Sequence, residues 1–183
     1  MGGLDTYVNS IFCFAPDGKI KICTINCPGS WHDSTQADYG VYKKLEDVYD
    51  QTGGKIVVDS AFQFQVKDYL IKSSQEDPVL NDATEEESAL AIVINSQATG
   101  LRQLSEWGMR MIEGQFPRLK DNCQLEDYGE RKVILHLMVM LYNYQTSKVG
   151  LNQIMNVFMS KTPGFQSYNT TLSEDGNGIL YWN

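Results

Sequence analysis

Two carboxylic acids in this sequence stand where they could hold a divalent cation. Asp59 follows the short apolar run 55–58, and an acid at the carboxyl end of a buried strand lies at the edge where α/β proteins bind ligands. Glu106 precedes Trp107 and Gly108, which indicate close packing, so we expect Glu106 to be half buried. A half-buried acid needs a cationic partner, and carboxylate oxygens are hard ligands that suit Mg²⁺ or Mn²⁺. Asp59 and Glu106 are therefore candidate metal ligands and candidate catalytic residues.

Each of these acids also has an ordinary structural interpretation. Asp59 is otherwise a solvated loop acid, or the N-cap of a turn that starts at Ser60. Glu106 is otherwise a helix surface carboxylate that pairs with Arg102 or Arg110, four residues away on either side. Spacing alone favours the structural interpretation of Asp59.

His32 and Asp33 form a second, auxiliary candidate for the site. They lie in the segment PGSWHDS at residues 28–34, and a histidine beside an aspartate invites a catalytic interpretation. Adjacent side chains rarely point the same way, however, and no activated serine accompanies them. Asp33 or Ser34 is therefore expected as the N-cap of the helix that follows.

The four cysteines, at positions 13, 23, 27 and 123, show no paired spacing. Without a secretion signal, free thiols are the expectation. Cys23, Cys27 and His32 lie close enough in the sequence to suggest a zinc site, but a fourth ligand at suitable spacing is missing. Thiols near a strand are more often small core side chains, and we expect that role here.

Basic residues are few, but four of them follow the acidic segment 73–88: Arg102, Arg110, Arg118 and Lys120. They are either ordinary solvated helix surface or a local strip for DNA phosphates beside the carboxylates.

The elements that position these residues can be predicted from hydrophobic period and turn chemistry. Residues 7–15 and 19–26 are rich in β-formers, and Pro-Asp-Gly between them indicates a hairpin. Residues 34–50 carry apolar side chains at helical spacing, and this helix should end before Gly53. The apolar run that ends at residues 59–60 predicts a short, buried central strand.

The second half of the chain is mainly helical in this interpretation. The polar segment 73–88 is a loop whose last part caps the next helix. A long helix is predicted over residues 89–112, limited by Pro117. Residues 130–144 predict a second helix, so apolar that most of its circumference should be buried.

We therefore expect one α/β domain over residues 1–160 and a flexible tail over residues 161–183. Hydrophobic residues make up 42% of the 183 residues, which supplies a core and excludes a wholly disordered chain. No membrane-length apolar run and no signal peptide are visible, so we expect an intracellular protein without a membrane partner.

The charge balance excludes one mode of DNA binding. The chain has 15 Lys and Arg against 23 Asp and Glu, a net charge of −8. Affinity for phosphates comes from clustered basic groups, so the overall field of this protein does not attract DNA. A role on nucleic acid requires local basic groups, carboxylate-bound metal ions or a partner protein.

Three motifs together resemble the DDE endonuclease domain of PIF/Harbinger-like transposases over roughly residues 8–159. The first is PGSWHDS at residues 28–34, and the second is GKIVVDSAF at residues 54–62, a strand that ends in Asp-Ser-Ala. The third is RQLSEWGMR at residues 102–110, which continues to QFPRL at residues 115–119. Each motif is weak alone, whereas their order and spacing are fairly specific.

The resemblance implies an RNase H-like fold, a mixed sheet flanked by helices, with an Asp-Asp-Glu triad that holds two divalent ions, Mg²⁺ or Mn²⁺. Asp59 would be the second acid of the triad and Glu106 the third. Such ions activate the attacking oxygen and stabilise the leaving oxygen in phosphodiester cleavage. The implied activity is that of a hydrolase acting on DNA in the nucleus. End recognition would fall to a separate Myb-like protein.

The family's first catalytic Asp lies on a strand before the hairpin, and we expect this chain to lack that strand and that acid. Whether the chain is an enzyme therefore stays open at this level. One function is a metal-dependent endonuclease; the alternative is an inactive transposase remnant or a domesticated binding or interaction domain.

Overall fold

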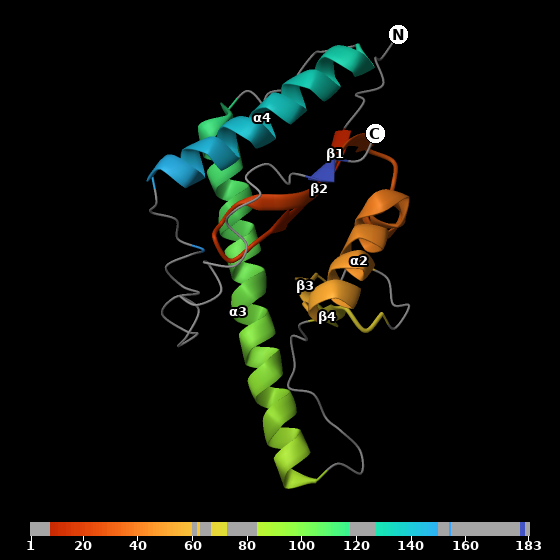
Figure 1. Cartoon of the computed structure of the whole chain (residues 1–183), viewed down its shortest axis with the longest axis vertical. Coiled ribbons are helices and arrows are strands. Elements are labelled where there is room, and N and C mark those ends of the chain that lie inside the picture. Colours follow the sequence, from red (N-terminus) through yellow and green to blue (C-terminus); the bar gives the residue numbers. More distant parts are fainter. Residues whose placement is uncertain are drawn as a thin grey trace.

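An antiparallel hairpin of β1 (Val8–Phe14) and β2 (Ile20–Pro28) confirms the first sequence prediction (Figure 1). The computed structural model describes residues 8–59, 62, 67–72, 84–117, 127–149, 154 and 180–181. The turn closes where the Ala15 N–H donates to the Lys19 carbonyl at 2.8 Å. Gly18 has φ of 79°, which glycine adopts without a steric penalty.

A third strand, β5 (Leu180–Tyr181), lies parallel to β2 and pairs with Ile22 and Cys23. The sheet order is therefore β1-β2-β5. The prediction of a flexible tail did not anticipate this pairing at its end. The other residues of 161–183 lie outside the described part of the chain.

The helix predicted over residues 34–50 forms in three pieces. These are α1 (Asp33–Gln36), a π-helical segment η1 (Ala37–Val41) and α2 (Tyr42–Thr52). The backbone leaves helical geometry at Gly40, where φ is 175° and ψ is −18°. As predicted, the last turn ends at Gly53, whose left-handed φ of 67° lets its N–H reach the Tyr49 carbonyl at 2.7 Å.

The start of this helix differs from the prediction. His32 is the N-cap, in an extended conformation, and it makes no side-chain capping bond. Asp33 is the first helical residue, where a negative charge favours the helix amino terminus. The prediction of Asp33 or Ser34 as the N-cap was therefore wrong by at least one position.

The strand predicted before Asp59 exists as β3 (Ile56–Val58), but its surroundings differ from the prediction. It pairs in parallel with β4 (Leu70–Lys72), which the sequence pattern did not reveal, in a separate two-stranded sheet. All three β3 residues are only partly buried. The prediction of a buried central strand was therefore wrong, because the only strand beside β3 within the described residues is the short β4.

The long helix predicted over residues 89–112 is α3 (Glu85–Gln115), and it runs along the longest axis in Figure 1. Its start is a complete capping box: the Thr84 side chain accepts from the Glu87 N–H, and the Glu87 carboxylate accepts from the Thr84 N–H. The predicted cap on the acidic segment is thus confirmed at Thr84. The helix stops one residue before Phe116, which precedes Pro117.

The second predicted helix is α4 (Tyr128–Val149), and it buries only one side. Its buried residues are Met138, Val139, Tyr142 and Asn143. Large apolar side chains elsewhere on α4 are 41–63% exposed: Val133, Ile134, Leu137, Met140, Leu141 and Tyr144. The prediction that most of the circumference is buried was therefore wrong. No helix among the described residues is both long and apolar enough to cross a membrane.

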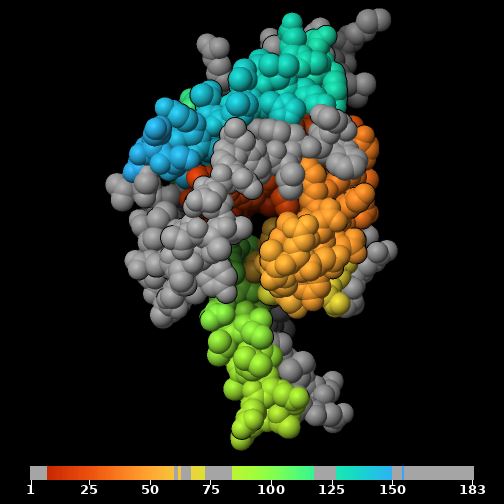
Figure 2. All heavy atoms as spheres, viewed as in Figure 1, coloured from red at the N-terminus to blue at the C-terminus, as the bar shows by residue number. Residues whose placement is uncertain are grey.

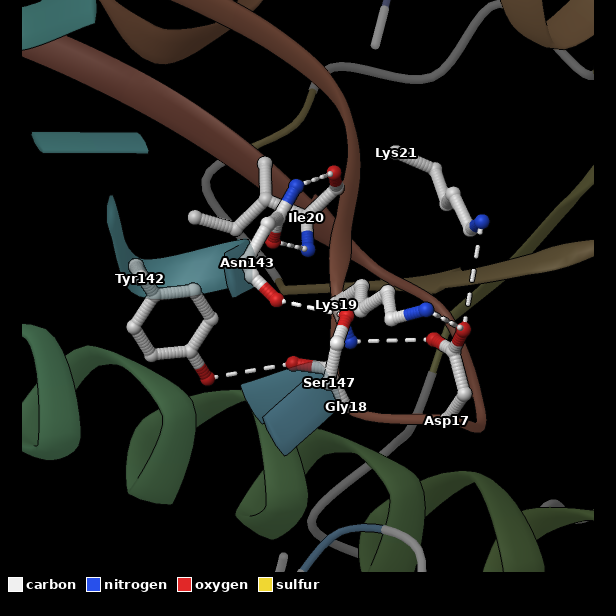
Figure 3. A network of polar contacts seen from close by, with 8 residues as sticks. All are labelled: Asp17, Gly18, Lys19, Ile20, Lys21, Tyr142, Asn143 and Ser147. Carbon is white, nitrogen blue, oxygen red and sulfur yellow. Dashed lines mark hydrogen bonds and ion pairs between the residues drawn. The ribbon is translucent and has the colours of Figure 1, made fainter. Parts of the chain in front are cut away.

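Two residues of α4 attach this helix to the hairpin (Figure 3). The Asn143 side chain accepts a hydrogen bond from the Ile20 N–H at 2.9 Å and donates one to the Ile20 carbonyl at 2.8 Å. The Tyr142 hydroxyl donates to the Gly18 carbonyl at 3.1 Å. All three bonds are buried, so the hairpin turn and α4 form one unit.

The hairpin lies between two hydrophobic clusters because successive side chains of β1 point to opposite faces. Ile11 and Cys13 belong to the cluster that packs against η1 and α2. Phe12 and Phe14 pack against the cluster that includes residues of α3 and α4. The described residues thus form a mixed α/β domain with small sheets and covering helices.

Candidate functional site

Asp59 lies directly after β3, as the sequence predicted. Its side chain is 54% exposed, and its carbonyl accepts a hydrogen bond from the Phe62 N–H at 3.2 Å. The Asp59 carboxylate therefore lies in solvent at the carboxyl end of β3, beside α3.

Glu106 lies on α3 and is also 54% exposed. Leu104, Gly108 and Ile112 form a buried stripe on this helix. Glu106 is two residues from both Leu104 and Gly108, which puts it on the opposite side of the helix. The close packing inferred from the local sequence therefore belongs to Gly108, whose neighbour is the ring of Phe14.

One guanidinium joins the two acids. Arg102 Nη1 lies 3.3 Å from Asp59 Oδ1, and its Nη2 lies 3.9 Å from Glu106 Oε1. The pair with Glu106 at four residues' distance is the one predicted from helix spacing, and it is confirmed. The pair with Asp59 spans 43 positions and was missed, since no local signal in the sequence relates a strand end to a distant helix.

Arg102 is more enclosed than its partners. Its side chain is 32% exposed, and its buried Nε has no hydrogen-bond partner among the described residues. The stem is thus packed while the two terminal nitrogens face the acids. Arg102 was predicted as a candidate phosphate contact, and here its guanidinium instead faces the two carboxylates.

The donor set fits a divalent cation. Two carboxylates supply hard oxygen ligands, and both lie against the Arg102 guanidinium. The position between Asp59 and Glu106 is therefore one where a cation is stabilised from both sides.

A third ligand does not join this pair within the part of the chain that the structure describes. No three histidine, cysteine, aspartate or glutamate side chains there gather closely enough to hold a metal ion. Asp33 and His32, predicted as auxiliary residues, are thus not grouped with Asp59 and Glu106. They lie instead at the start of α1.

The same observation removes the zinc alternative built on Cys23, Cys27 and His32. Cys13, Cys23 and Cys27 are free and buried, as expected for core thiols. Burial raises the pKa of Cys13 to about 12 and that of Cys23 to about 11. Both thiols are therefore protonated at neutral pH, as buried core thiols are.

Of the remaining basic candidates, Arg110 is exposed on α3 and makes no ion pair with either acid. Its charge is open to solvent, as a phosphate contact requires. Arg118 and Lys120 lie outside the described residues.

Comparison with known proteins places the motifs in a family. A family model described as DDE superfamily endonuclease matches residues 5–143, more than half of the chain. The match includes the hairpin, Asp59, Glu106 and most of α4. Comparisons with curated proteins and with solved structures gave no significant match. The chain, in which Asp59 and Glu106 converge on Arg102, belongs to the DDE superfamily endonuclease family.

Proposed function

We propose that this domain is a transposase-derived endonuclease that cleaves DNA phosphodiester bonds with a divalent cation held by Asp59 and Glu106. The observation that carries the proposal is the convergence of these two acids, from a strand end and from a helix, on one positive charge. Membership of the endonuclease family supplies the reaction class.

The chemistry suits the residues. When bound, Mg²⁺ or Mn²⁺ supplies Lewis acidity at the phosphate and neutralises the charge that develops in the displacement. Asp59 and Glu106 hold the cation through oxygen ligands, and their exposure leaves room for a large substrate. Arg110 offers an exposed positive charge on the same helix, which suits a backbone phosphate.

The finer assignment within the family rests on the sequence motifs. We place the chain with PIF/Harbinger-like transposases and propose an RNase H-like arrangement in which Asp59 and Glu106 are the second and third acids. The order of hairpin, helix, Asp59-bearing strand and Glu106-bearing helix supports this assignment. A nuclear location and a separate Myb-like partner for end recognition belong to the same proposal, and the net charge of −8 supports the need for a partner.

Nicking of supercoiled plasmid in Mg²⁺ or Mn²⁺ tests the activity. Wild-type protein should nick the plasmid, and Asp59→Asn and Glu106→Gln should each reduce nicking at least about a hundredfold, since each removes a charged ligand oxygen. The matched control is Asp50→Asn, because Asp50 is an exposed acid on α2. It should nick like the wild type.

Two results would contradict the proposal. Intact plasmid with the wild-type protein in both ions would exclude cleavage by this chain. Equal nicking by wild type, Asp59→Asn and Glu106→Gln would show that other groups, or a contaminant, perform the reaction.

A second function is favoured by one observation: no third carboxylate accompanies Asp59 and Glu106 within the described residues. On this basis the alternative is an inactive, domesticated domain that binds DNA or protein without cleavage. Fluorescence anisotropy with labelled duplex DNA separates the two functions. Binding in Mg²⁺ without any product would support the second, and cleavage that depends on Asp59 would exclude it.

A further inference from the structure

Arg102 lies against the two acids that the proposed function makes the ligands of a metal ion. It contacts Asp59 with one terminal nitrogen and Glu106 with the other, so the two pairs share one charge. A divalent cation held by the same two oxygens would stand beside a fixed positive charge. The two cations repel each other, and they compete for the same lone pairs.

We propose that Arg102 is a built-in competitor for the metal, an internal cation that neutralises Asp59 and Glu106 until a divalent ion displaces it. The inference rests on the proposed function, since it assumes that these two acids are the ligands. In this role, Arg102 sets the concentration of divalent ion at which the site fills.

The exposure of the groups makes displacement feasible. Both carboxylates are 54% exposed, and ion pairs in such a setting are weak because water screens them. A divalent ion carries twice the charge and accepts oxygen ligands from both acids at once. The guanidinium therefore lowers metal affinity without blocking the site.

The burial of the Arg102 stem explains why the competitor stays nearby. The side chain is only 32% exposed, and its Nε is enclosed. After displacement the terminal nitrogens need to move, while the packed stem keeps the charge close to the acids. Arg102 therefore competes from a high local concentration, which a free cation in solution does not have.

Mn²⁺ binding to the full chain, measured by the electron paramagnetic resonance signal of the free ion at fixed ionic strength, tests the inference without any activity assay. Arg102→Gln should bind Mn²⁺ about five- to tenfold more tightly than the wild type, because two exposed pairs no longer oppose binding. Arg102→Lys keeps the charge but has one ammonium in place of two terminal nitrogens, so its affinity should lie between those of the wild type and Arg102→Gln.

Two controls isolate the cause. Lys148→Gln makes the same change of net charge on α4, a different helix from the one that carries Glu106, and should change affinity by less than about twofold. The triple variant Arg102→Gln/Asp59→Asn/Glu106→Gln should lose the gain, because neither acid that the arginine masks is charged any longer. Melting temperatures of all variants in EDTA establish that each one folds.

The outcomes separate the inference from the proposed function. If Asp59→Asn weakens Mn²⁺ binding but Arg102→Gln leaves it unchanged, the acids bind metal and the competitor role is overturned. If Arg102→Gln binds more tightly even after both acids are neutralised, the gain arises elsewhere and the inference is again overturned. If Asp59→Asn and Glu106→Gln both bind Mn²⁺ as tightly as the wild type, the proposed metal site itself is wrong.

Discussion

Gly108 lies where α3 packs against the ring of Phe14 from β1. A Cβ at this position would stand 2.7 Å from the ring, closer than any stable carbon contact. Phe14 cannot easily move, because its ring also packs edge-on against Tyr142 at 6.2 Å between centroids. We expect Gly108→Ala to lower the free energy of unfolding by about 1–3 kcal/mol, measured by urea denaturation.

Gly114, on the same helix, is the matched control. A Cβ there meets nothing within 4 Å, so Gly114→Ala gains helix propensity at no steric cost. We expect it to raise the free energy of unfolding by up to ~1 kcal/mol. A Gly108→Ala protein as stable as Gly114→Ala would contradict the packing described for α3 and β1.

The buried thiols predict a pH dependence of stability. Desolvation raises the pKa of Cys13 and Cys23 from 9.0 to about 12 and about 11, respectively. Above pH 9 the unfolded chain loses these protons while the folded chain keeps them, so stability falls as pH rises. We expect a loss of up to about 1.4 kcal/mol per pH unit for each thiol between pH 9 and 11.

Urea denaturation at several alkaline pH values checks this expectation. The slope, rather than the absolute stability, is compared between the wild type and Cys13→Ala/Cys23→Ala. The double variant should show a shallower decline, since tyrosine and lysine titration is common to both proteins. Identical slopes would mean that the thiols ionise as easily in the folded state as in the unfolded chain.

At the scale of single elements, the amino-terminal turns of α3 make few contacts with other described residues besides those of their cap. In Figure 2 these turns extend beyond the other coloured elements, and Leu90, Val93 and Ile94 are 44–60% exposed. Thr84→Ala removes the side-chain acceptor of the Glu87 N–H and should cost about 0.5–2 kcal/mol locally. Hydrogen exchange at residues 85–90 should accelerate severalfold, while global unfolding changes less.

Thr99→Ala provides the comparison for Thr84→Ala. Thr99 lies inside α3, where its hydroxyl donates to the Asn95 carbonyl at 2.9 Å, and it has no part in the cap. Exchange at residues 85–90 should match the wild type in this variant. Acceleration of the same amides in both variants would argue against a specific capping effect.

Elements with local signals could be predicted from the sequence. Pro-Asp-Gly indicated the hairpin turn, Gly53 indicated the end of α2, and the acidic run in the first turn of α3 indicated its cap. In each case a few neighbouring residues determine backbone geometry by themselves. Asp59 at the end of β3 and Glu106 on α3 followed from the same kind of reasoning.

Features that depend on distant partners could not be predicted. β4 has three residues and forms only by parallel pairing with β3. No turn residues in the sequence indicate this pairing. The apolar sequence of α4 specified a helix but not how much of it β2 would cover. The contact between Arg102 and Asp59 likewise depends on where β3 meets α3.

At the scale of the whole molecule, the bonds between α4 and the hairpin join parts of the chain 123 residues apart. Asn143→Leu keeps the branching of the side chain but leaves the Ile20 N–H and carbonyl without partners in a buried site. Each such group costs about 1–3 kcal/mol, so we expect the free energy of unfolding to fall by about 3 kcal/mol. Equilibrium denaturation measured by circular dichroism checks this value.

Ser147→Ala is the control for this substitution, because the Ser147 hydroxyl donates only to the Asn143 carbonyl within α4. It should cost less than ~1 kcal/mol and leave the Ile20 contacts in place. If Asn143→Leu proved as mild as Ser147→Ala, the amide would not be what attaches α4 to the hairpin.

The Asn143 amide has a consequence for how this protein behaves among copies of itself. By bonding both the N–H and the carbonyl of Ile20, it occupies the side of β2 that faces away from β1, just before β5 pairs at Ile22 and Cys23. An open strand edge of this kind is a template for intermolecular β-pairing and aggregation. A single side chain from a helix thus takes the place of a neighbouring strand. Asn143→Leu should therefore cause concentration-dependent, thioflavin-positive aggregation and not only a lower melting temperature.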